Sequence, residues 1–162
     1  MTTITKGENM NVEFINAFLN AGIRVLETMA FVKPVSGKPF LKQDNQSRGD
    51  ISGVIGLTGS KKGAVVFSLS KEAALKIVSS MLGQQYSEMN DEVRDAVGEL
   101  TNIIAGDARR ELAEKGHVFE AGIPTVIVGK GHEIVSIVKE PTIAIPFKID
   151  NDPFIVEASF EK

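Results

Sequence analysis

The sequence predicts an α+β fold in which a mostly antiparallel sheet carries long helices packed on one face. Two observations support this class. Apolar residues recur at helical spacing in three separate segments, and residues 142–160 alternate between apolar and polar positions as strands do. The 162 residues suffice for one domain with a sizeable core. We therefore expect a flexible N-terminus over 1–11 and a single domain over 12–162.

The first part of the chain is expected to form a helix followed by a hairpin. Residues 12–30 carry apolar side chains at helical intervals, and 34–49 is polar and rich in turn-forming residues, which is typical of a loop. Residues 51–58 and 63–69 are apolar runs separated by Gly-Ser-Lys-Lys. We predict that these two runs are strands joined by a tight turn.

Two capped helices should follow the hairpin. Ser70 is suited to be the N-cap of a helix that stops at Gly83, where glycine can adopt the left-handed conformation that ends many helices. Asn90 is the expected N-cap of the next helix, whose first turn is acidic and so favours the positive end of the helix dipole. That helix should extend to about Lys115 and end at Gly116.

The remaining sequence indicates β-structure. The last two of its four candidate strands alternate clearly, with their apolar side chains on one face and a turn at Asn151 and Asp152 between them. The predicted strands are 124–128, 133–139, 142–149 and 154–160.

Composition excludes several classes of function. The net charge of −3 comes from 18 basic and 21 acidic residues with no clustered basic face, so nucleic-acid binding is not expected. The absence of cysteine excludes disulfides, thiolate metal sites and cysteine nucleophiles. No apolar run is long enough to span a membrane, and the N-terminus lacks the apolar core of a secretory signal. We expect a cytoplasmic protein without membrane or nucleic-acid partners.

The most informative segment lies in the second capped helix, where Asp95, Glu99 and Asn102 stand at i, i+4 and i+7. These three side chains share one face of a helix. The apolar stripe of the same helix lies on roughly the opposite side, so core packing does not require the three polar residues. The stripe consists of Val93, Ala96, Val97, Leu100, Ile104 and Ala108. Most polar helix faces of this kind are ordinary solvent-exposed surface. The sequence around these three residues must therefore decide whether they form a functional site.

Two glycines occur inside the same helix. Gly98 lies beside the polar face, and Gly106 shares it. A glycine within a helix costs about 1 kcal/mol relative to alanine. Gly98 and Gly106 therefore indicate that another group approaches this helix closely.

Other polar residues favour structural interpretations. His117 and His132 are far apart in sequence and have no acidic or histidine cluster at metal-ligand spacing, so no metal site is expected. Asp107 lies near the apolar side of its helix and should be buried with a partner that the sequence does not identify.

The segment 98–106, with Asp95 four residues before Glu99, resembles the signature helix of the CheC/CheX/FliY phosphatases of bacterial chemotaxis. Their pattern is Asp or Ser, three residues, Glu, two residues and Asn. The flanking sequence is most similar to the CheX branch, and the likeness covers roughly residues 10–160. The flanking segments that carry it are 53–59, 63–70, 73–78, 81–83 and 124–129.

This resemblance implies a CheC/CheX-like fold and the hydrolysis of the aspartyl phosphate on a phosphorylated CheY-type response regulator. It implies that Glu99 and Asn102 are catalytic and that Asp95, Gly98 and Gly106 face the partner. It further implies a homodimer. The regulator would bring its own Mg²⁺, so no cofactor or metal is expected on this chain.

The chemistry that the resemblance implies suits an amide. Hydrolysis of an acyl phosphate requires mainly that a water be held in line with the P–O bond. Asn102 offers both a donor and an acceptor to orient that water. Glu99, one turn back, would pair with a lysine of the regulator. The alternative is a docking module that binds a regulator or another chemotaxis protein without turnover.

The first predicted helix repeats part of the motif. Glu13 and Asn16 have the Glu-x-x-Asn spacing, but Asn9 stands where the pattern has Asp or Ser. Glu13 also lies close to the expected start of its helix. We therefore do not expect a second working site.

Overall fold

A computed structural model describes residues 6–42, 49–132 and 142–161. Within these residues the second and third helices occupy the positions that their apolar spacing and caps predict, and the first begins earlier than predicted. The three helices are α1 (Lys6–Met29), α2 (Lys71–Leu82) and α3 (Asp91–Glu114). None of the described helices is long and apolar enough to cross a membrane.

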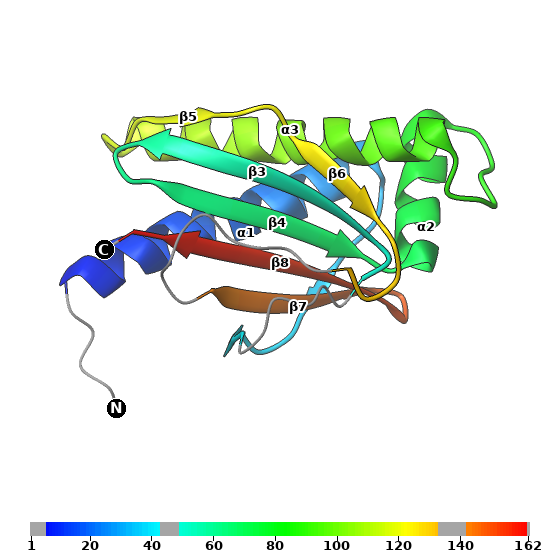
Figure 1. Cartoon of the computed structure of the whole chain (residues 1–162), viewed down its shortest axis with the longest axis horizontal. Helices are drawn as coiled ribbons and strands as arrows, with labels where there is room; N and C mark the ends of the chain where they lie inside the picture. The colour runs from blue at the N-terminus through cyan, green and yellow to red at the C-terminus, as the bar shows by residue number, and fades with distance from the viewer. Residues whose placement is uncertain (1–5, 43–48, 133–141, 162) are drawn as a thin grey trace.

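The described strands form one antiparallel sheet with the order β1-β7-β8-β4-β3-β5, in which β2 also pairs with β7 and β6 also pairs with β3. Helices α1 and α3 run behind this sheet, with α3 along the edge formed by β5 and β6, and α2 stands at one end of the strands (Figure 1). The α+β class and the one-sided helical layer are therefore confirmed. The strand bounds are β1 (Val35–Ser36), β2 (Phe40–Leu41), β3 (Ile51–Gly59), β4 (Gly63–Leu69), β5 (Phe119–Ala121), β6 (Thr125–Val128), β7 (Ile143–Ile149) and β8 (Asp152–Phe160).

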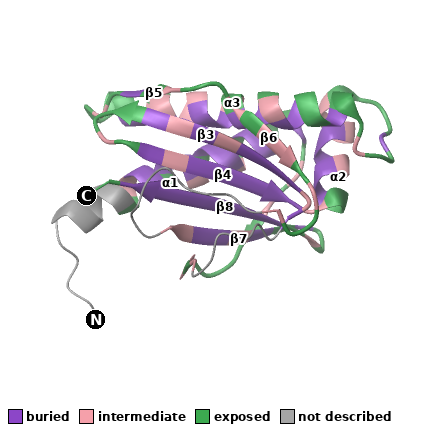
Figure 2. Ribbon diagram, viewed as in Figure 1, coloured by how far each residue is buried: buried purple, intermediate pink, exposed green. Residues whose placement is uncertain are grey.

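The core lies between the helices and the central strands, which are almost continuously buried (Figure 2). Phe160 of β8 packs against Phe14 of α1 with ring centroids 5.3 Å apart in an edge-on arrangement that aromatic quadrupoles favour. On the other side of β8, the carboxylate of Glu157 lies 2.8 Å from the Lys42 ammonium, and both side chains are buried. The alternation in the sequence thus places the apolar side chains of β8 on the face toward the helices and Glu157 on the other face. Both faces of β8 are nevertheless buried.

An ion pair joins the two long helices. Arg24 of α1 donates from Nη2 and Nε to the Asp107 carboxylate of α3, at 2.8 and 3.0 Å. Asp107 also accepts from Arg110 of its own helix. Arg24 is therefore the partner of Asp107 that the sequence could not identify.

The structure differs from the predicted elements at several boundaries. Helix α1 begins at Lys6 rather than near Val12, and the short strands β1 and β2 lie in the segment expected to be a loop. The short strand β5 was also missed. Its three residues are too few to show alternation. The predicted strand 133–139 falls outside the described residues, and the flexibility expected for 1–11 stays a prediction.

Candidate functional site

Local contacts fix the start of the motif helix. Asn90 is the N-cap of α3, and its side-chain oxygen accepts from the Val93 amide at 2.9 Å. Tyr86, in the connection from α2, donates from its hydroxyl to the Glu92 carboxylate in the first turn of α3. Burial and this hydrogen bond hold the connection against the helix. The Asn90 cap and the Tyr86 hydrogen bond therefore fix the first turn of α3, which precedes the polar face.

The middle of α3 is seated on the sheet through Thr101. This residue is buried, and its hydroxyl donates to the Val97 carbonyl one turn earlier at 2.8 Å. Its side chain faces β3 at Gly53, where the lack of a Cβ lets the helix approach. Asn102 follows Thr101 directly, so this contact sets how the next side chain points outward.

The polar face of α3 is exposed as its spacing predicts. Asp95, Glu99 and Asn102 are all exposed, whereas every residue of the apolar stripe of α3 is buried. Within the described part of the chain, no hydrogen bond or ion pair occupies the side chain of Glu99 or Asn102. Their polar atoms are thus available to a molecule that approaches from solvent.

The three motif residues line a shallow hollow of about 290 Å³ between α3 and the strand at its side. Sequence reasoning missed three of its members. Arg94 could have been found, because it lies one turn before Gly98 on the helix. Pro124 and Val126 come from another element and are brought here only by the tertiary fold. The hollow is lined by Arg94, Asp95, Gly98, Glu99, Asn102, Pro124 and Val126.

The two helix glycines differ in their surroundings. A Cβ at Gly98 would lie 3.2 Å from Cγ2 of Val126, so β6 is the group that approaches α3 at this point. A Cβ at Gly106 would meet nothing within 4 Å. Gly98 therefore has a packing role within the chain. That Gly98 and Gly106 face a partner protein stays a prediction.

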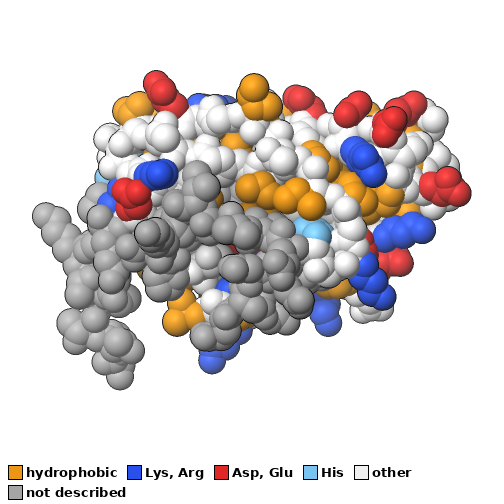
Figure 3. Space-filling view, in the orientation of Figure 1, with side chains coloured by type: hydrophobic (Ala, Val, Ile, Leu, Met, Phe, Trp, Pro, Cys, Tyr) orange, Lys and Arg blue, Asp and Glu red, His pale blue; other side chains and the backbone are white. Residues whose placement is uncertain are grey.

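The surface around the hollow combines charge with apolar area. Acidic side chains and isolated hydrophobic ones share the edge of the molecule along α3 and the β5–β6 connection (Figure 3). Arg94 adds one positive charge beside the carboxylates of Asp95 and Glu99. An open site of this kind suits recognition of a protein surface better than enclosure of a small molecule.

The histidines contribute to structure. His132 Nε2 lies 2.7 Å from the hydroxyl of the buried Ser52, and His117 Nε2 lies 3.6 Å from the Glu13 carboxylate. Across the described residues, no three His, Asp or Glu side chains are grouped so that they could hold a metal ion.

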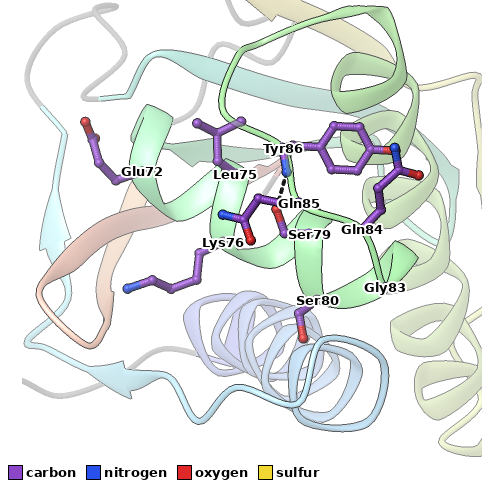
Figure 4. A pocket seen from close by; sticks show the side chains of 9 residues that line it. All are labelled: Glu72, Leu75, Lys76, Ser79, Ser80, Gly83, Gln84, Gln85 and Tyr86. Carbon is purple, nitrogen blue, oxygen red and sulfur yellow. Dashed lines mark hydrogen bonds between the residues drawn. The ribbon is translucent and has the colours of Figure 1, made fainter.

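A larger hollow of about 590 Å³ lies on α2 and the connection that follows it, and it shares no residue with the motif (Figure 4). Its hydroxyl groups are engaged. Ser79 accepts from the Tyr86 amide at 3.0 Å, and Ser80 donates to the Ala30 carbonyl at 2.5 Å. Lys76 is held by Asp150 and Asp152. Size alone therefore does not make it the functional site.

The repeated Glu-x-x-Asn of α1 has a structural explanation. The Glu13 carboxylate lies 3.8 Å from the Lys115 ammonium at the end of α3, in addition to its contact with His117. Asn16 is exposed. Glu13 thus lies within 4 Å of two basic groups of its own chain, whereas no ion pair within 4 Å joins Glu99 to any residue in the described part of the chain.

Comparison with known proteins places the chain in a class defined by this fold and this helix. The family model described as chemotaxis phosphatase CheX matches residues 51–148. The chain belongs to the CheX family of chemotaxis phosphatases.

Individual relatives agree with this assignment. The chain is 30% identical over 128 residues to the CheY-P phosphatase CheX of Thermotoga maritima, covering 78% of this chain and 83% of that protein. It resembles the crystal structure of CheX from Desulfovibrio desulfuricans with a TM-score of 0.85 and 42% identity, covering 92% and 99% of the two chains. It also resembles the structure of a CheX–CheY–BeF₃–Mg²⁺ complex from Borrelia burgdorferi with a TM-score of 0.78 and 29% identity, covering 92% and 98%.

Proposed function

We propose that this protein hydrolyses the aspartyl phosphate of a CheY-type response regulator, using the exposed face of α3. The observation that carries the proposal is that Glu99 and Asn102 stand side by side, exposed and unengaged, in an open hollow. The name of the Thermotoga relative and the Borrelia complex support a phosphorylated CheY-type substrate. An open helix face can enter the site of another protein.

In the proposed reaction, water attacks the phosphorus atom in line with the bond to the aspartyl oxygen. That P–O bond breaks, the regulator regains its carboxylate, and the phosphoryl group leaves as H₂PO₄⁻ with both water protons. The Asn102 carboxamide orients the water, because its oxygen can accept from the water and its nitrogen can donate to an oxygen of the reacting group. Positioning of this kind is the main contribution that a protein makes to phosphoryl transfer.

Glu99 serves recognition in this proposal. Its carboxylate, one helical turn before Asn102, pairs with a lysine on the regulator and so fixes the register of docking. Asp95, a further turn back, contacts the rim of the partner. Gly106 leaves the same face unobstructed, since a Cβ at this position would meet nothing within 4 Å.

The regulator is expected to carry the Mg²⁺ that neutralises the phosphoryl oxygens, so the phosphatase itself needs to supply no metal ligand. We also propose that the protein is a twofold homodimer with both motif helices exposed, because an open sheet has edges that association can cover. Sedimentation at micromolar concentration checks the dimer, and a monomer alone would contradict it.

The second candidate is a docking module that binds the regulator without turnover. Binding would use the charges of Asp95 and Glu99 but would not require the amide of Asn102. The effect of replacing Asn102 therefore distinguishes a phosphatase from a docking module.

The test replaces Asn102 by alanine and measures the decay of phosphorylated regulator. Because Asn102 is exposed, we expect the free energy of unfolding to stay within about 0.5 kcal/mol of the wild-type value. The regulator affinity should be largely retained, whereas turnover should fall by on the order of 10²-fold or more. Gln85→Ala, which removes an exposed amide from the hollow on α2, is the matched control and should leave turnover unchanged. If Asn102→Ala dephosphorylates the regulator as fast as the wild type does, the water-positioning mechanism is wrong.

A further inference from the structure

We propose that Ile123, in the connection between β5 and β6, is the apolar anchor that docks the phosphorylated regulator beside the motif helix. This inference rests on the proposed function and extends it from the reacting residues to the docking surface. Ile123 is 92% exposed. A large aliphatic side chain held in water in this way contributes nothing to the core. In protein interfaces a few large side chains that the partner buries contribute most of the binding energy, and Ile123 is placed to be one of them.

The backbone around Ile123 is held on both sides. The Gly122 amide donates to the Gly56 carbonyl of β3 at 3.0 Å. The strands that flank the connection pair with the same β3 strand, Ala121 opposite Leu57 and Thr125 opposite Val54. The connection is therefore fixed at each end. A side chain presented from a fixed backbone loses less conformational freedom on binding than one on a loose loop.

The same connection reaches the motif. Pro124, the next residue, lines the hollow together with Glu99 and Asn102. Val126 then packs against α3 at Gly98, which lacks the side chain that would keep β6 away. This contact seats the β6 end of the connection against the motif helix. A partner that reaches Asn102 thus also meets the segment that carries Ile123.

The size of the site requires such an extension. A specific protein interface covers about 800 Å² on each partner, with an apolar centre and a polar rim. The motif face offers carboxylates and an amide, which suit orientation and register but supply little apolar area. On the other flank α3 packs against α1, to which Arg24 and Asp107 tie it. The β5–β6 connection, in contrast, carries the exposed side chain of Ile123 next in sequence to Pro124, which lines the hollow.

Charge favours the regulator over a second copy of this chain as the occupant. The hollow carries the carboxylates of Asp95 and Glu99 against the one guanidinium of Arg94, so a twofold contact centred on it would bring two surfaces of net negative charge together, which is unfavourable. A regulator that offers a lysine to Glu99, as the proposed function requires, gives complementary charge instead. Ile123 then packs against an apolar part of the regulator beside that lysine.

The test measures binding separately from turnover. Ile123→Asp is titrated with a CheY-type regulator in its beryllofluoride form, and the decay of the phosphorylated regulator is measured at saturating concentrations. We expect Kd to rise at least about tenfold, because a charge then replaces an apolar side chain that docking would bury. Turnover at saturation should stay within about twofold of wild type. Val35→Asp, at a residue 70% exposed on β1 at the opposite edge of the sheet, is the matched control and should leave Kd unchanged.

Three outcomes would overturn the anchor. The first is an unchanged Kd in Ile123→Asp, and the second is an equal loss of affinity in Val35→Asp. The third is a shift from dimer to monomer in sedimentation with unchanged regulator affinity, which would assign this edge to a second copy. Failure of the proposed function would give a different result. The wild-type protein would then bind the regulator without accelerating its dephosphorylation, and the Kd values of wild type and Ile123→Asp could still be compared.

Discussion

Gly53 of β3 faces Thr101 of α3 so closely that a methyl group at position 53 would lie 1.9 Å from the Thr101 hydroxyl oxygen. Thr101 precedes Asn102 in the motif helix and is buried. The distance between the sheet and the motif helix is therefore set by a glycine that lies far from the motif in sequence. Disturbing this contact should affect both the stability of the fold and the presentation of Asn102.

The first prediction replaces Gly53 by alanine. Because the added methyl group overlaps a side chain in a packed region, we expect a loss of about 1–3 kcal/mol in the free energy of unfolding, measured by urea denaturation. Gly56→Ala is the matched control on the same strand, since a Cβ there meets nothing within 4 Å. Equal stability of the two variants would show that the Gly53–Thr101 contact does not limit the approach of α3.

The second prediction concerns the charge of Glu99. If this carboxylate pairs with a lysine on the regulator, Glu99→Gln should weaken docking at low ionic strength, and the difference from wild type should shrink as salt is added. Glu114→Gln, which removes an exposed acid from the end of the same helix, should change the affinity little. Calorimetric titration at two salt concentrations measures both. If Glu99→Gln binds the regulator with wild-type affinity at low salt, the Glu99 carboxylate does not pair with a lysine of the regulator.

The third prediction concerns the buried ion pair between Lys42 and Glu157. Glu157→Ala leaves the Lys42 ammonium buried without its partner, which should cost about 3–5 kcal/mol. Replacing both residues by apolar ones of similar size should cost clearly less, because no unpaired charge then remains. Chemical denaturation of the single and double variants gives the comparison. A double variant as unstable as Glu157→Ala would show that the cost comes from packing and not from the charge.

The fourth prediction concerns pH. The hydrogen bond from Tyr86 to Glu92, then burial and the charge of Glu92, raise the pKa of Tyr86 above its ordinary value of 10.0. The neutral phenol therefore stabilises the folded state. This contribution is fully present below about pH 10 and is lost as the pH rises through the higher pKa of the folded protein.

Absorbance titration measures this pKa without interference, because Tyr86 is the only tyrosine and the chain has no tryptophan. Glu92→Gln removes the charged acceptor and should move the pKa of Tyr86 back toward 10.0. An identical titration midpoint in wild type and Glu92→Gln would contradict the assigned cause.

The sequence by itself determined the elements that carry the site. Apolar spacing gave α3 its buried stripe and left Asp95, Glu99 and Asn102 exposed, because a regular helix fixes which side chains share a face. The caps at Ser70, Gly83 and Asn90 were equally readable, since capping depends on contacts within a few residues. The family followed from these local patterns and their order along the chain.

Only the tertiary structure decided what surrounds that helix. The approach of Val126 to Gly98, the pairing of Arg24 with Asp107 and the burial of Glu157 against Lys42 all join residues distant in sequence. Helical and strand periodicity describe one element at a time and carry no information about which elements become neighbours. The position of Ile123 beside the motif helix likewise depends on strand pairing with β3, so the docking surface that we propose emerges only when the sheet is assembled.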